Sequence, residues 1–146
     1  MDLSALSYRQ ATIADLELTF RIKSNSLRPY VEEVWGWDEN VQRQYHKKNF
    51  KPDNIKLLLL NNCEIGYLEA EYTEKGIYIA NLLVEHNFQG IGLGTKVLNS
   101  LIYEANSKNK TLHLEVLKVN TRAKNLYERL GFKLTGENEK KFIMAK

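Results

Sequence analysis

The sequence predicts an α+β domain, and three features of the chain support this prediction. Short apolar runs separated by turn residues fill the middle of the chain, at about residues 55–84, as in an antiparallel meander of strands. Two amphipathic helical patterns follow at 92–106 and 120–130, and a strand-like segment lies between them. The 146 residues suit a single domain, 1–146, which can bury a core without disulfides or a metal.

The first third of the chain is predicted to hold a short strand and then mostly helix. A strand over 7–10 precedes a helix whose inner face begins with Ile13 and Leu16, and a second helix is predicted over 27–34. A third helix follows the sequence Trp35-Gly36-Trp37. Caps and breaks in this region are expected at Thr12, Asp38 and Pro52.

The middle of the chain is predicted to form an antiparallel meander. Strands over 56–60 and 64–72 flank a tight turn at Asn61-Asn62. The next segment, 77–84, is almost unbroken apolar sequence, which is typical of a strand buried on both faces.

The last third alternates helix and strand. The apolar residues of 92–106 share one helical face, and a strand is expected at 111–117. Asn120 and Gly131 have the residue types expected just before and just after a helix. Two short strands are expected at 132–134 and 141–145, with a turn at 136–138.

Composition narrows the possible functions and partners. Lysine and arginine outnumber aspartate and glutamate by 21 to 18, an excess that suits an anionic small ligand and gives no argument for nucleic acid binding. The single Cys63 excludes an internal disulfide and, with only three histidines, argues against a metal site. The apolar run 57–60 is far shorter than the ~18 residues of a membrane span, and the N-terminus lacks a signal pattern. We therefore expect a cytoplasmic protein without a membrane partner.

A glycine-rich loop leads into the helix at 92–106. Its residues 89–96 read Gln-Gly-Ile-Gly-Leu-Gly-Thr-Lys, which places free backbone N–H groups at a helix N-terminus that favours phosphate. A Walker loop is excluded because Lys96 follows Thr95 rather than a glycine. A dinucleotide fingerprint lacks its third small residue, which would fall on Thr95 or Val97. By itself the loop also fits a tight connection with no ligand.

Two blocks of sequence resemble the GNAT superfamily of N-acyltransferases. The pattern Gln89-x-x-Gly92-x-Gly94 resembles its acetyl-CoA pyrophosphate loop. The second block is similar to its C-terminal motif and reads Leu114-Glu115-Val116, then Asn120-x-x-Ala123-x-x-Leu126-Tyr127-Glu128-x-x-Gly131-Phe132. The two blocks cover roughly 77–135. The resemblance implies a mixed, mostly antiparallel sheet of six or seven strands flanked by about four helices.

The resemblance also implies the cofactor and where it binds. In such enzymes the central strands splay apart, and the pantetheine arm of acetyl-CoA runs between them along the fourth strand. The residues expected to contact the cofactor are Leu82, Leu83, Val84, Gln89, Gly90, Ile91, Gly92, Leu93, Gly94, Thr95 and Asn120. Lys124, like Lys96 and Arg122, lies near a helix start within reach of phosphates, and we take it as a further minor contact.

The implied reaction is direct acetyl transfer to a primary amine in a ternary complex, which requires two proton carriers. A protonated amine (pKa ~8 to ~10.4) must lose a proton before it attacks, and the departing thiolate must gain one. By resemblance Tyr127 is the acid, and Glu115 occupies the base position of the ribosomal-protein N-terminal acetyltransferases. A packing role for Tyr127 and a salt-bridged role for Glu115 remain alternatives. Glu69 and Glu71 are rival bases, acting through water.

The acceptor site is expected in the N-terminal helices and the hairpins. Trp35 and Trp37, with Glu32 and the hairpin residues Glu69 and Glu71, could bind a cationic amine. An equally good interpretation has both tryptophans anchoring the helices on the sheet. The sequence names no acceptor, and a small molecule and a protein amine both stay open.

Two other function classes remain. One is a noncatalytic acyl-CoA-binding or regulatory module with the same fold, and the other is a nucleotide-binding protein, which the glycine spacing disfavours. Homodimers are common in the superfamily, although no interface motif is legible in this chain.

Overall fold

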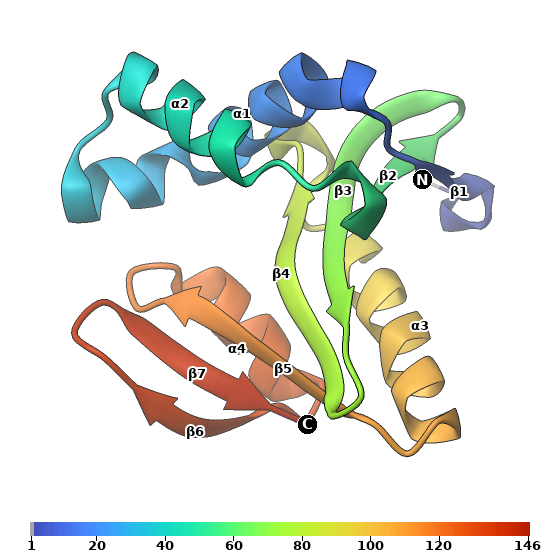
Figure 1. Ribbon diagram of the computed structural model, residues 1–146. Helices are drawn as coiled ribbons and strands as arrows, with labels where there is room; N and C mark the ends of the chain where they lie inside the picture. The colour runs from blue at the N-terminus through green and yellow to red at the C-terminus, as the bar shows by residue number, and fades with distance from the viewer. Residues whose placement is uncertain (1) are drawn as a thin grey trace.

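The computed structural model describes residues 2–146, which form one seven-stranded mixed sheet carrying helices (Figure 1). The strand order is β1-β2-β3-β4-β5-β7-β6, and within the described chain only β4 and β5 run parallel. This confirms the predicted mixed, mostly antiparallel sheet. The strands are β1 (Leu6–Gln10), β2 (Ile55–Leu60), β3 (Cys63–Tyr72), β4 (Gly76–Val84), β5 (Thr111–Leu117), β6 (Lys133–Glu137) and β7 (Lys141–Ala145). The α-helices are α1 (Leu16–Trp35), α2 (Glu39–Asn49), α3 (Leu93–Ser107) and α4 (Thr121–Arg129).

Two apolar clusters hold the helices to the sheet. The larger cluster joins the buried residues of α3 and Tyr127 of α4 to strands β2 to β5 and β7. The smaller cluster joins Ile22 of α1 to Leu57, Tyr67 and Leu83 of the strands. Helices α1 and α2 therefore lie over a different part of the sheet from α3 and α4. Within residues 2–146, no helix is long and apolar enough to cross a membrane.

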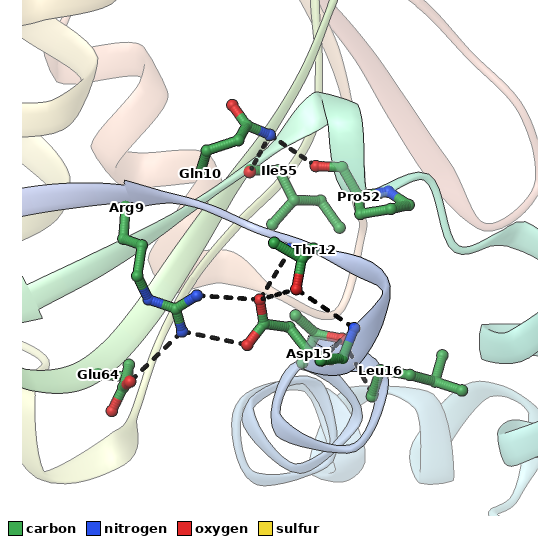
Figure 2. Close-up of polar contacts among 10 residues, drawn as sticks. Arg9, Gln10, Thr12, Asp15, Leu16, Pro52, Ile55 and Glu64 are labelled. Atoms are coloured by element: carbon green, nitrogen blue, oxygen red, sulfur yellow. Dashed lines mark hydrogen bonds and ion pairs between the residues drawn. The ribbon is translucent and has the colours of Figure 1, made fainter.

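The entry into α1 is fixed by a polar network (Figure 2). Arg9 donates to both carboxylate oxygens of Asp15, at 3.0 and 3.1 Å. The same carboxylate accepts from the backbone N–H of Thr12 at 2.8 Å, while the Thr12 hydroxyl accepts from the N–H of Ala14. These bonds form a capping box and confirm the predicted cap at Thr12. Arg9 and Thr12 hold the pKa of Asp15 below its usual value.

The prediction that Ile13 lies on the inner face was wrong. Residues Ile13–Asp15 form a 3-10 turn ahead of α1, and Ile13 is 83% exposed. The different pitch of that turn rotates Ile13 away from the face that Phe20 and Ile22 bury.

The prediction of a separate helix over 27–34 was also wrong, because α1 runs without interruption through Pro29. A proline in a helix removes one backbone hydrogen bond, here to the carbonyl of Asn25. The turn before it is anchored to the sheet by Ser26, whose hydroxyl donates to the carbonyls of Ile22 and Val84. Asp38 then caps α2 as predicted, since its carboxylate accepts from the N–H of Val41 at 3.1 Å.

The predicted meander is confirmed, with one correction. Asn61 and Asn62 form the β2–β3 turn with positive φ of 53° and 63°. Strand β4 is not buried on both faces along its whole length: Ile77 and Ile79 are buried, but Ala80 is exposed. The reason is that β4 loses its neighbour β5 at this point, as described below.

The last third follows the prediction closely. Asn120 caps α4, and Gly131 has the positive φ of 96° that ends it. Strand β6 extends to Glu137, beyond the predicted end at Leu134, because β7 continues to pair with it up to Phe142. The turn therefore lies after Glu137, where Asn138 accepts from two backbone N–H groups.

Candidate active site

The central strands β4 and β5 are paired over only half their length. Their register runs from Gly76–Thr111 to Ile79–Leu114 and then stops. Glu69 of β3 pairs with Asn81, and Ala70 pairs with Ile79, so Ala80 is an extra residue in β4. Figure 1 shows the two strands meeting near the start of β4 and diverging toward its end. The splay leaves one edge of β4 over 80–84 without a strand partner.

A cavity of about 410 Å³ lies along this free edge, on the side of α4. The strand contributes Leu82, Leu83 and Val84 to its wall. Of the predicted cofactor residues, the loop and helix positions that line it are Gln89, Gly90, Gly92, Leu93, Gly94, Thr95 and Asn120. Ile91 instead packs against the larger core cluster. We call this space the donor cavity.

The glycine loop brings backbone N–H groups to the donor cavity. Gly90 and Gly92 have φ of 78° and 92°, which side chains rarely adopt. Gly92 precedes the first turn of α3, where the first amides of a helix have no intrahelical acceptor, and it offers no side chain to cap them. Gln89 fixes the loop, since its side-chain amide donates to the Val84 carbonyl at 2.8 Å. These donors, with the helix dipole, fit a pyrophosphate.

Two arginines line the donor cavity, whereas Lys124 does not. Arg122 and Arg129 are both in its wall. Lys124 forms an ion pair with Glu128 at 2.9 Å and lies over the ring of Phe142. The sequence contained a signal for Arg129, because the helical spacing of positions 122, 126 and 129 places them on one face of α4, the face that lines the cavity.

Tyr127 lies where the donor cavity meets a second cavity. Its side chain is only 8% exposed, packs edge-on against Phe132, and lines both spaces. Burial raises the pKa of its hydroxyl to about 12, and no charged neighbour contributes to the shift. The hydroxyl therefore keeps its proton at neutral pH and can donate it. Asn120 also lines both cavities, while its side chain caps α4 by accepting from Ala123 at 3.1 Å.

The second cavity, of about 650 Å³, lies between α1–α2 and the strands β3, β4, β5 and β7. We call it the acceptor cavity. It shares Leu82, Leu83 and Tyr127 with the donor cavity. The two spaces thus meet at the splay.

All three predicted base candidates line the acceptor cavity. Glu69 accepts from the Asn81 side chain at 2.9 Å, and Glu115 lies 3.7 Å from the ammonium of Lys141. Glu71 is the third. Burial raises the pKa of the Tyr78 hydroxyl, and the negative charges of Glu115, Glu69 and Glu71 raise it further, with Glu115 contributing the most of the three. All three carboxylates therefore lie near the Tyr78 side chain. Glu115 is exposed, as its alternation with buried Leu114 and Val116 predicted.

The predicted acceptor residues divide into two groups. Trp35, Glu69 and Glu71 line the cavity. Trp37 and Glu32 do not: the Trp37 ring N–H donates to Glu39, and Glu32 pairs with Arg28 at 3.2 Å. Trp35 is 51% exposed, which contradicts the interpretation that it anchors the helices on the sheet.

Sequence reasoning missed several side chains of the acceptor cavity. Lys23, Tyr45, Tyr78 and Lys141 line it from four different elements. They share no spacing along the chain, so no sequence signal groups them. Within residues 2–146, no cluster of three His, Cys, Asp or Glu side chains has the arrangement of a metal site.

The profile of the acetyltransferase (GNAT) family matches residues 21–132, more than three quarters of the chain. The protein belongs to this family. The [Ribosomal protein bS18]-alanine N-acetyltransferase of Haemophilus ducreyi is 37% identical over 89 residues, which cover 51% of this chain and 61% of that protein. The spermine/spermidine N(1)-acetyltransferase of Bacillus subtilis is 33% identical over 76 residues, 48% of this chain and 50% of that protein. The matches thus span about half to three fifths of these relatives.

Solved GNAT structures share the fold over nearly the whole chain. PaiA N-acetyltransferase from Thermoplasma acidophilum, solved in complex with coenzyme A, superposes with a TM-score of 0.79 at 16% identity, covering 97% of this chain and 98% of that one. The ribosomal-protein-S18-alanine N-acetyltransferase from Escherichia coli has a TM-score of 0.71 at 22% identity, with coverage of 96% and 92%. At these identities the likeness establishes the fold.

Proposed function

We propose that this GNAT protein transfers the acetyl group of acetyl-CoA directly to a primary amine in a ternary complex. The observation that carries the proposal is the meeting of the two cavities at Tyr127, through the gap between β4 and β5. A donor on one side and an amine on the other would meet there without a covalent enzyme intermediate. Acetyl-CoA, when bound, supplies an activated thioester.

The donor cavity fits the parts of acetyl-CoA by their chemistry. The free amides before and in the first turn of α3, together with Arg122, would hold the pyrophosphate. The edge of β4 without a strand partner, at 82–84, would bind the amide groups of the pantetheine arm as an added strand does, except at the Val84 carbonyl, which already accepts from Ser26 and Gln89.

Tyr127 is the proposed acid and Glu115 the proposed base. The Tyr127 hydroxyl, protonated at neutral pH, would donate its proton to the sulfur as the thiolate leaves. Glu115 would remove a proton from the amine, directly or through water, and Glu69 and Glu71 lie in the same cavity as rival bases. Removal of each carboxylate in turn, followed by the acid limb of the pH profile of kcat/KM, identifies the base.

Two measurements on the purified chain test the proposed function. Calorimetric titration with acetyl-CoA, with NAD and ATP as controls, should show selective binding. Release of free thiol in the presence of a panel of amines should then report turnover. Binding without transfer to any amine would favour a noncatalytic acyl-CoA-binding module, and an absence of binding by folded protein would refute the proposal.

A further inference from the structure

The charges lining the acceptor cavity are balanced. Three carboxylates, from Glu69, Glu71 and Glu115, face three ammonium groups, from Lys23, Lys51 and Lys141. His46 also lines the cavity, and burial lowers its pKa to about 4, so it adds no charge at neutral pH. An acceptor with several positive charges would need an acidic excess. A balanced lining instead fits a ligand that carries both signs.

Lys23 is the charged group of the cavity with the least compensation. It projects from the middle of α1, and its ammonium lies 5.3 Å from the centre of the Tyr45 ring. Among the described residues it forms neither an ion pair nor a side-chain hydrogen bond; Glu69 attracts it only at longer range, and Lys141 repels it. Burial is the largest reason that the pKa of the Lys23 ammonium is lowered.

The other charged groups of the cavity have closer partners or lie in water, as the exposed Lys51 and Glu71 do. Lys141 lies 3.7 Å from Glu115, and Glu69 accepts from Asn81. An anionic group placed beside Lys23 would therefore restore the interactions that its ammonium loses on leaving water. The same group would lie on the α1 side of the cavity, across from Glu115 on β5.

We propose that the acceptor carries a carboxylate near its amine, as a free amino acid does, and that Lys23 binds that carboxylate while the amine faces the glutamates. This inference rests on the acetyl transfer proposed above. Leu27, one helical turn from Lys23, and the ring of Tyr45 supply apolar wall near Lys23, so an amino acid with an apolar side chain is the best first probe.

A comparison of phenylalanine with phenylalaninamide tests the proposal, because the two differ in the carboxylate. The native chain should acetylate phenylalanine with a kcat/KM at least ~10-fold above that of the amide. Lys23→Met should abolish this preference, Lys23→Arg should restore most of it, and Lys48→Met, on the exposed side of α2, should leave it intact. Taking the ratio between variants cancels the difference in amine pKa between the two substrates.

A binding measurement gives a readout that does not depend on turnover. Phenylalanine titrated into the CoA-loaded chain should bind, and Lys23→Met should weaken this binding about as much as it lowers kcat/KM. Equal use of amino acid and amide, after correction for the unprotonated fraction of each amine, or an unchanged preference in Lys23→Met, would overturn the inference. In a dipeptide the carboxylate lies farther from the amine. Faster acetylation of a dipeptide than of free phenylalanine would therefore also overturn the inference.

Spermine separates failure of this inference from failure of the proposed function. If the chain binds acetyl-CoA and acetylates spermine in preference to every amino acid, acetyl transfer stands and the role of Lys23 is refuted. If acetyl-CoA does not bind at all, both proposals fail.

Discussion

The donor and acceptor sides of this GNAT protein are built in different ways. The donor cavity is lined mainly by two short stretches of chain, 82–95 and 120–129, with help from α1. The groups it offers to an anion are backbone amides beside two positive-φ glycines, together with Arg122 and Arg129. The acceptor cavity draws its polar side chains from α1, α2, β3, β4, β5 and β7. In the proposed function, backbone amides would bind the donor that the family shares, whereas scattered side chains, which can change one by one, would set the acceptor.

The largest effect is expected at Tyr127, which belongs to both sides. Tyr127→Phe should lower kcat by about 10³-fold, roughly 4 kcal/mol, because the thiolate loses its proton donor. The Kd of acetyl-CoA should change less than about twofold. Assays of thiol release measure kcat, and calorimetry measures the Kd of acetyl-CoA. Tyr103→Phe, on the exposed face of α3, is the control. Unchanged turnover would leave Tyr127 with packing alone.

A smaller effect, on stability, is expected from the buried His46 of the acceptor side. Its pKa of about 4 in the folded chain lies below the ordinary 6.5, so the unfolded chain takes up a proton first as the pH falls. Stability should therefore be intact above pH 6.5 and fall by roughly 3 kcal/mol between pH 6.5 and 4. Asp15, whose pKa is lowered, adds to the loss only at more acidic pH.

Denaturant unfolding across this range measures the slope. His46→Gln should flatten it, although the variant also loses the 2.9 Å contact with Thr19 and starts less stable. If the slope is the same in the variant, protonation of His46 does not govern the acid response.

On the donor side, Gly92→Val should weaken acetyl-CoA binding by about tenfold, or ~1.4 kcal/mol, and leave the acceptor KM unchanged. Gly92 has a φ of 92°, which valine rarely adopts, so the substitution would distort the loop that brings backbone amides to the donor cavity. Gly36→Val is the matched control, since Gly36 has a φ of 79° but lies after α1, outside the donor cavity. Equal loss of acetyl-CoA affinity in both variants would assign the effect to general strain.

The smallest expected difference distinguishes two neighbouring cations. Arg122→Met should weaken acetyl-CoA binding by about three- to fivefold, whereas Lys124→Met should change it less than twofold. The reason is that Arg122 lines the donor cavity and Lys124 is paired with Glu128. The reverse order in calorimetry would support the sequence-based choice of Lys124 instead.

The parts of the fold that sequence predicted well are those fixed by neighbours in the chain. Thr12, Asp38 and Asn120 cap helices through atoms two or three residues away, and Asn61-Asn62 close a turn by their own φ values. The residues of the glycine loop themselves indicated an anion site at a helix N-terminus, whereas the splay and the proposed role of Tyr127 were expected only from the resemblance to GNAT enzymes.

The errors arose where distant contacts decide the outcome. The first two predicted helices are one helix, α1, because Ile22 and Ser26, just before the predicted start at residue 27, are held against the sheet. Ala80 becomes exposed because β5 leaves β4, which no local pattern reports. Lys23 lines the same cavity as the glutamates through tertiary packing alone.

The half-length pairing of β4 with β5 also has a thermodynamic consequence. Among residues 2–146, the strand pairing from Gly76–Thr111 to Ile79–Leu114 is the only one that joins the β1–β4 part of the sheet to the part formed by β5, β7 and β6. A ligand that fills the gap would hydrogen-bond to one part while contacting the other, and so would act as a reversible cross-link. By mass action, a ligand at 100 times its Kd adds about 2.7 kcal/mol to the free energy of unfolding. The melting temperature of this protein should thus rise with donor concentration, and amide exchange at the β4–β5 junction should slow.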